Sequence, residues 1–454
     1  MKTAIKSVMA VILGGGLFVA GCSKKQTATF RPLNNLEVTA QLKSFAAEKE
    51  AQESKLAETD VKDFANNYAG EVSKLVRPDC RSFFAAAAKG DWQTVSNLWS
   101  EMERHTLGLS KATKGYPHGM WLQPVRETFG AAEAFAVGDE KYSRAFGEDV
   151  IQSIPIGSIY FGGTDPGRFI VTALQKSHTG GDPLFTLTQN ALADGTYLNY
   201  LRSMYADRIY IPTADDSQKS FQDYLAAAQV RLKENKLKPG ENIKVTDGRV
   251  QVSGQTAVME INGLLVKTIF EKNPDREFYI EESFPLDWMY PNLEPHGLIM
   301  KINRQPPPEL SNELVQQDHD YWTKYVTPMI GGWLDYDTPV ADLTAFGQKV
   351  FLRHDFSGFK GDPGFVQNDY SCKMFSKLRS SLANLYVWRM NQAVTADKKG
   401  RMAREADFAF RQALALCPYS PEAVKGYVNF LKSQNRDSDA VLVSELTKQF
   451  PRQK

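Results

Sequence analysis

The residues most suited to binding a ligand lie in a glycine turn at positions 162–169, after the apolar run 158–161. Pro166 suits the first position of a helix, and N–H groups at a helix start favour anionic ligands. Arg168 adds positive charge, whereas Asp165 would repel a phosphate and suits a hydroxyl-rich ligand or a helix cap. The glycines fit neither the dinucleotide fingerprint nor the P-loop. A purely structural turn is the alternative to a ligand site here. The candidate ligand-binding residues of the turn are Gly162, Gly163, Thr164, Asp165 and Arg168.

Two further acidic positions follow predicted elements of the same region. Asp215 precedes a predicted helix beside Asp216, where carboxylates act as helix caps or as acid/base partners. Glu281 and Glu282 follow a predicted core strand and are close in sequence to Trp288. A carboxylate pair beside aromatic residues is what glycan cleavage requires, and a solvated strand end is the alternative. Asp215 and Glu281 therefore complete the candidate ligand site.

Several classes of chemistry have no support in the sequence. The six histidines are scattered without metal-ligand spacing, so we expect no metal site. No GxSxG elbow is present, so a hydrolase triad has no basis, and we expect no cofactor. Charge is balanced, with 54 Lys+Arg against 53 Asp+Glu, which gives no reason to expect a nucleic-acid partner. The catalytic residues are unknown, and a non-enzymatic role is favoured over an enzyme.

Strands and helices alternate in residues 151–305, which we predict to form an α/β domain. Strands are expected near 158–161, 184–188, 249–252, 277–280 and 298–302, the last as an antiparallel edge. Helices are expected at 166–175, 195–204, 216–235 and 257–273. The short loops between the first two strands and their helix predict a parallel pair. The fold class is therefore an α/β core, a small mainly parallel sheet with covering helices, flanked by α-helical TPR-like hairpins.

Helical patterns occupy residues 36–150 and 306–454 on either side. The charged stretch 36–76 reads as one helix, either a membrane-proximal stalk or a helix packed on the body. Near the C-terminal end, Ala406, Phe410, Ala413 and Pro418 match the second half of a tetratricopeptide (TPR) repeat. Small residues there let two helices approach and Phe410 fills the gap, which predicts a protein partner bound through helical repeats.

The first residues resemble a bacterial lipoprotein signal. Lys2 and Lys6 precede a short apolar run that ends in Ala20-Gly21-Cys22, as in the lipobox. The prediction is a signal peptide at 1–21, lipid on Cys22, a tether at 22–35 and membrane attachment through that lipid. The resemblance implies sorting to the outer membrane, facing the periplasm, because Ser23 rather than Asp follows the cysteine. An ordinary signal peptide or a membrane-spanning anchor is the alternative.

Three cysteines follow Cys22 in the chain. Cys80, Cys372 and Cys417 are an odd number, so at least one thiol stays unpaired in a monomer. We expect single buried thiols. A Cys372–Cys417 disulfide is the alternative.

Three stretches of the centre resemble the soluble portion of large bacterial membrane proteins similar to protein O-mannosyltransferases. These are 162–169, Gly195-Thr-Tyr-Leu-Asn-Tyr-Leu201 and His296-Gly-Leu-Ile-Met300. The resemblance covers roughly residues 150–450. This chain lacks the multi-span half in which such transferases hold their catalytic acid, so transferase activity is not implied. The resemblance implies an accessory domain on a lipid anchor.

The function expected from these features is a non-enzymatic, lipid-anchored envelope protein that acts as a protein- or glycan-interaction scaffold. The alternative is a carbohydrate-active or glycan-binding accessory to a membrane glycosyltransferase, with its site at the α/β face.

Overall fold

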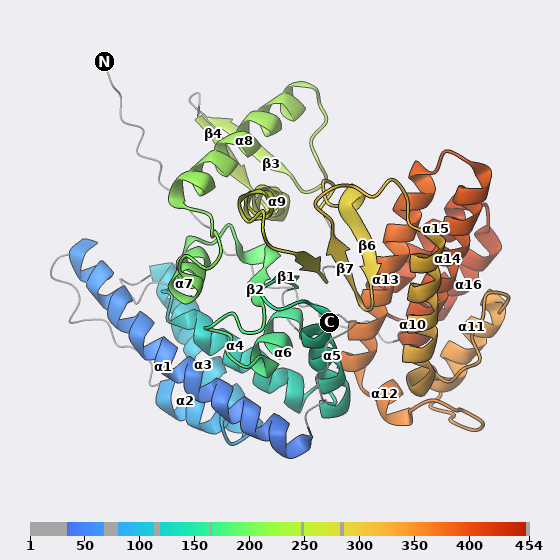
Figure 1. Ribbon diagram of the computed structural model, residues 1–454, viewed down its shortest axis with the longest axis horizontal. Coiled ribbons are helices and arrows are strands. Elements are labelled where there is room, and N and C mark those ends of the chain that lie inside the picture. The colour runs from blue at the N-terminus through green and yellow to red at the C-terminus, as the bar shows by residue number, and fades with distance from the viewer. Residues whose placement is uncertain are drawn as a thin grey trace.

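The computed structural model describes residues 34–67, 80–112, 119–163, 166–246, 249–281 and 286–450. Within them, helices surround a small central sheet (Figure 1). The predicted signal peptide, Cys22 and most of the tether lie outside the described residues. No helix of the described part is both long and apolar enough to cross a bilayer.

The N-terminal helices pack together on one side of the sheet, and α1 lies along them (Figure 1). The side chains of Val38, Phe45 and Leu56 are buried, so the described part of the predicted 36–76 helix packs on the body. Between α2 and α3, Gly90 has a φ of +71°, which glycine adopts without strain, and Asp91 accepts a hydrogen bond from the Thr94 amide. These helices are α1 (Asn35–Asn67), α2 (Cys80–Ala87), α3 (Trp92–Ala112), α4 (Leu122–Ala136) and α5 (Glu140–Ser153).

The central sheet has the strand order β2-β1-β5-β7-β6. The predicted parallel pair of β1 and β2 is confirmed, and β5 also runs parallel to β1. Strands β7 and β6 run antiparallel, so the sheet is mixed. Strand β7 was expected at the edge and instead lies inside, because β6 pairs beyond it. Sequence reasoning missed β6, which contains Pro295, a residue tolerated on edge strands. The strands are β1 (Ile159–Gly162), β2 (Phe185–Thr188), β5 (Phe278–Ile280), β6 (Leu293–His296) and β7 (Ile299–Ile302).

The helices predicted between these strands are present within two residues of their expected ends. A separate antiparallel hairpin packs with two of them, and only its second strand was predicted. The helices are α6 (Pro166–Leu174), α7 (Gly195–Tyr205), α8 (Ala214–Lys233) and α9 (Gln255–Lys272), with the short η2 (Gln189–Ala191) and η3 (Tyr290–Asn292); the hairpin is β3 (Asn242–Thr246) and β4 (Arg249–Ser253).

The C-terminal residues form helices joined mostly by short connections, at the right of Figure 1. Phe410 stacks on Tyr427 with ring centroids 5.7 Å apart, and Ala406 and Ala413 are fully buried. The helices are α10 (Asn312–Ile330), α11 (Val340–Phe346), the π-helical η4 (Gly347–Leu352), α12 (Pro363–Gln367), α13 (Asp369–Gln392), α14 (Ala396–Leu416), α15 (Pro421–Ser433) and α16 (Asp437–Lys448).

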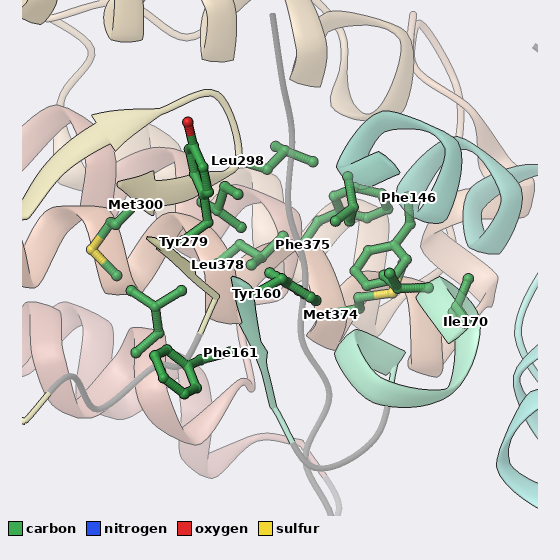
Figure 2. Close-up of a cluster of buried hydrophobic side chains, with 14 of the residues drawn as sticks. Phe146, Tyr160, Phe161, Ile170, Tyr279, Leu298, Met300, Met374, Phe375 and Leu378 are labelled. Atoms are coloured by element: carbon green, nitrogen blue, oxygen red, sulfur yellow. The ribbon is translucent and has the colours of Figure 1, made fainter. Parts of the chain in front are cut away.

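One hydrophobic core runs from the N-terminal helices through the sheet into the C-terminal helices. Strands β1 and β2 are buried at every position, as strands covered on both faces require. In Figure 2, Leu378 of α13 lies on one side of Tyr160 of β1, and Met374 of α13 lies on the other, with Phe146 and Ile170 beyond it. The sheet therefore shares its core with both helical regions, across the boundary predicted at residues 305/306.

Candidate functional site

The predicted turn lies at the carboxyl end of β1, next to the carboxyl end of β5. Gly163 donates its backbone N–H to the carboxylate of Glu281, which is buried at 1% exposure. A Cβ on Gly167 would lie 2.3 Å from Glu281 Oε1, so this glycine allows the carboxylate to approach the start of α6. The structure thus brings Gly162, Gly163 and Glu281 together. The candidate residues Thr164 and Asp165 lie outside the described residues.

Arg168, the predicted charge of the turn, points away from it. Its guanidinium is buried and binds Glu127 of α4, with Nη2 2.9 Å and Nε 3.2 Å from Oε1. Nη2 also donates to Gln123 at 2.9 Å. Burial alone would lower the pKa of Arg168, but the Glu127 carboxylate raises it above its ordinary value. In this structure the Arg168 side chain is therefore committed to the protein interior.

Asp215 is exposed in the first turn of α8, away from Glu281. Its neighbour Asp216 binds Lys272 at the end of α9, before β5, whereas Glu281 follows β5. The helix cap predicted here is made by Thr213 and Asp216, whose side chains each bind the other's backbone N–H. Asp215 and Glu281 therefore lie at opposite ends of β5 and do not share a cleft.

Sequence reasoning missed a fully buried ionic cluster centred on Glu127. Lys49 of α1 lies 2.6 Å from Glu127 Oε2, and Tyr200 of α7 donates to the same oxygen at 2.5 Å. Lys49 Nζ also lies 2.7 Å from His178 Nδ1 and donates to Tyr200 at 2.9 Å. With Arg168, the cluster draws side chains from α1, α4, α6, α7 and the loop after α6. No spacing in the sequence signals it, because its members are up to 151 residues apart.

The cluster satisfies its charges internally. Burial alone would raise the pKa of Glu127, but the charges of Lys49 and Arg168 hold it well below its ordinary value. Burial and the Lys49 charge lower the pKa of His178, so its ring is neutral at pH 7 and Nδ1 accepts from Lys49. Burial also lowers the pKa of Lys49, against the attraction of Glu127. A buried, paired cluster of this kind fixes α1 on the body.

A groove at the other side of the molecule is open to solvent. It has a volume of about 780 Å³ and runs between α13 and α15, with the segment before β6 closing one end. The α13 positions that line it recur every three or four residues, so they share one helix face. We call this the helical groove; its lining is Asp287, Tyr290, Ser380, Asn384, Val387, Trp388, Asn391, Pro421, Glu422, Lys425, Gly426 and Asn429.

Polar side chains in the helical groove are left without partners. Among the described residues, none accepts from or donates to the side-chain amides of Asn384, Asn391 and Asn429, and none pairs with Lys425. Trp388 stacks on Tyr290 with centroids 5.8 Å apart. The groove therefore presents amide donors and acceptors, one cation, two carboxylates and an aromatic surface to whatever enters it.

The described residues contain no group of His, Cys, Asp and Glu side chains that could hold a metal ion. Cys80, Cys372 and Cys417 are buried free thiols in the structure. Burial raises the pKa of Cys372 well above its ordinary value and that of Cys417 to about 12. These two thiols are thus protonated at neutral pH, which makes them poor nucleophiles.

Comparisons with protein-family models, with curated proteins and with solved structures found no match to this chain. The resemblance to the mannosyltransferase-like proteins therefore stays a prediction from the sequence.

Proposed function

We propose that this protein is a non-enzymatic, lipid-anchored envelope protein that binds an extended peptide segment of a partner protein in the helical groove. The observation that carries the proposal is the set of unpaired side-chain amides that line the groove. The anchor rests on the lipobox at Cys22, with the outer membrane and the periplasm as the site of action.

An extended peptide fits this chemistry. An asparagine side chain offers two N–H donors and a carbonyl acceptor, which matches the alternating C=O and N–H groups of a peptide backbone. Asn384 and Asn391 lie seven residues apart on α13, and Asn429 faces them from α15. Lys425 adds a cation for an acidic side chain or a terminal carboxylate, and Val387 offers apolar contact. In this reading α13 to α16 act as TPR-like pairs, with α13 and α15 presenting the binding face.

Glycan binding is the second candidate, and one observation favours it in the same groove. Trp388 and Tyr290 form an aromatic surface beside the Asp287 carboxylate and the asparagine amides. An apolar ring face beside hydroxyl-binding groups also suits a sugar. This role corresponds to an accessory of a membrane glycosyltransferase.

Selection from a random peptide display library on the immobilised protein tests the proposal. We expect enriched peptides whose affinity falls about tenfold with Asn384→Ala or Asn391→Ala, since losing one or two hydrogen bonds costs about 1–2 kcal/mol. Asn97→Ala is the matched control, because Asn97 is exposed on α3.

Peptides that bind the groove variants as well as the unaltered protein would refute peptide binding in this groove. A glycan array read with the same variants and with Trp388→Ala separates the second candidate. Glycan binding that depends on Trp388, with no enriched peptide, would favour the glycan role.

A further inference from the structure

A second pocket, of about 660 Å³, lies between the end of α7 with the loop that follows it and the end of α9 with the loop that precedes β5. Four cationic side chains line it, from Arg202, Arg208, Lys272 and Arg276, against the carboxylates of Asp207 and Asp275. We call it the guanidinium pocket. It is distinct from the helical groove and shares no lining residue with it.

The arginines of this pocket are held by uncharged groups. Arg276 donates to the carbonyls of Gly157 at 3.0 Å and Arg208 at 2.9 Å. Arg202 donates to the Pro212 carbonyl and the Asn199 side chain. In the part of the chain that the structure describes, neither Arg202, Arg208 nor Arg276 forms an ion pair with a carboxylate. Carbonyl contacts fix a guanidinium in place and leave its full charge uncompensated.

Not all of the cations are equally free. Lys272 is paired with Asp216 at 3.0 Å. Arg208 donates to the Met204 and Tyr205 carbonyls at the end of α7, where the helix dipole itself is negative. Arg276, by contrast, binds loop carbonyls, and Arg202 binds a loop carbonyl and an amide. Arg202 also lies in the last turn of α7, so Arg276 is the arginine of this pocket whose charge is not accounted for by the dipole of α7.

Both arginines also keep donors for a ligand. The Nε atoms of Arg202 and Arg276 have no acceptor among the described residues, and both remain accessible to solvent. The close approach of Arg276 to the backbone depends on Gly157, where a Cβ would lie 2.8 Å from Nη1. Arg276 also stacks on the Phe185 ring at 5.4 Å, which further fixes its plane. Two guanidinium groups that are held in place, each with its Nε–H still available, suit the recognition of a tetrahedral oxyanion.

We propose that the guanidinium pocket binds a phosphate group, with Arg202 and Arg276 as its donors and Lys272 as an additional cation. The phosphate belongs to a soluble phosphate ester or to a phospholipid headgroup. The volume lies in the range of pockets for small molecules, so there is room for the group that carries the phosphate.

Calorimetric titration of the purified protein tests this with inorganic phosphate, glycerol 3-phosphate and monomeric short-chain dihexanoyl phosphatidylglycerol. Chloride at equal ionic strength gives the background. We expect phosphate-dependent binding that falls about tenfold or more with Arg276→Gln, since this variant removes a charged hydrogen-bond donor to the phosphate. Tighter binding of glycerol 3-phosphate identifies a soluble ester as the ligand, and tighter binding of the lipid identifies a headgroup.

Two further variants keep the result interpretable. Lys272→Gln changes an exposed side chain, so it tests the pocket if Arg276→Gln fails to fold, and we expect a loss of threefold or more. Arg353→Gln is the control, because Arg353 is exposed and outside the pocket. No phosphate-dependent heat in the unaltered protein would overturn the proposal, as would an equal loss in Arg353→Gln. The arginines would then serve only to tie loops and helix ends together.

Discussion

Replacing Lys49 by methionine removes the one cation that α1 contributes to the buried cluster around Glu127. The change deletes the 2.6 Å ion pair and the bonds of Lys49 to Tyr200 and His178. Glu127 keeps Arg168 at 2.9 Å and Tyr200 at 2.5 Å. Breaking a buried pair costs about 3–5 kcal/mol, and the remaining partners place this variant near the lower end, at about 3 kcal/mol.

Glu127→Gln is expected to cost more than Lys49→Met. It leaves Lys49 and Arg168 buried together without their shared carboxylate, so we expect about 5 kcal/mol. In the double variant the neutral amide that replaces the Glu127 carboxylate faces Tyr200 and one buried cation, Arg168, instead of two. The cost of the double variant should therefore fall short of the sum of the single costs by about 1 kcal/mol or more.

Hydrogen exchange, measured by mass spectrometry on peptides from residues 35–67, reports the loss of stability in α1 itself. The free energy of opening of α1 is the quantity compared, because a chain of this length need not unfold in one step. Lys219→Met is the control, since the Lys219–Asp223 pair is exposed on α8 and should contribute less than about 1 kcal/mol. A change below about 0.5 kcal/mol for Lys49→Met, like that of a surface substitution, would refute the assignment of the cluster as the anchor of α1.

Three other outcomes are expected. The pKa of His178 is lowered in the folded state, so the unfolded chain binds the proton first and stability falls as the pH drops below the unfolded pKa of about 6.5. Urea unfolding between pH 7 and pH 5 should therefore show a shallower pH dependence of stability in His178→Asn. An unchanged slope would contradict this. Arg168→Gln should lower the melting temperature while Asp215→Asn leaves it unchanged, since only Arg168 is buried and paired; equal melting temperatures would argue against the structural role. Gly426→Ala places a Cβ 2.6 Å from the Phe410 ring, so we expect the free energy of unfolding, measured by chemical denaturation, to fall by about 1–3 kcal/mol. An unchanged free energy of unfolding would mean that the Phe410 ring moves aside without cost.

Local patterns in the sequence were sufficient for most of the elements. The helix that begins at Pro166 and the strands rich in β-branched and aromatic residues are indicated by neighbours within a few residues. The structure has these elements where they were expected. The edge strand β6 was harder to predict, because Pro295 interrupts its strand pattern. In the separate hairpin, β3 was missed although the sequence Asp247-Gly248 is a hairpin signal. Edge strands carry weaker patterns than buried ones, since only part of each is covered.

The candidate site could not be predicted to the same extent. Arg168 looked like a ligand residue because its charge stands next to a glycine turn, but the helix directs it to Glu127 on another element. The buried pair Arg379–Asp318, 2.8 Å apart between α13 and α10, illustrates the same limit. Such pairs form between residues distant in the chain, so they leave no periodicity or spacing to read. The helical groove likewise depends on how α13 and α15 pack, which the repeat motif indicates only in outline.

The core shared by the sheet and α13 bears on how this chain could be divided or recombined. Met374, Phe375 and Leu378 lie around Tyr160 of β1 (Figure 2), and Arg389 donates to the carbonyls of Leu293 and Pro307 on both sides of the boundary predicted at 305/306. A fragment cut at that boundary would expose an apolar helix face and lose these bonds. The helical part is therefore not a transplantable module: moved alone into another protein, it would need a new surface in place of the sheet. For the same reason, we expect a substitution on β7 that faces α13 to be accompanied, among related chains, by a compensating substitution on α13.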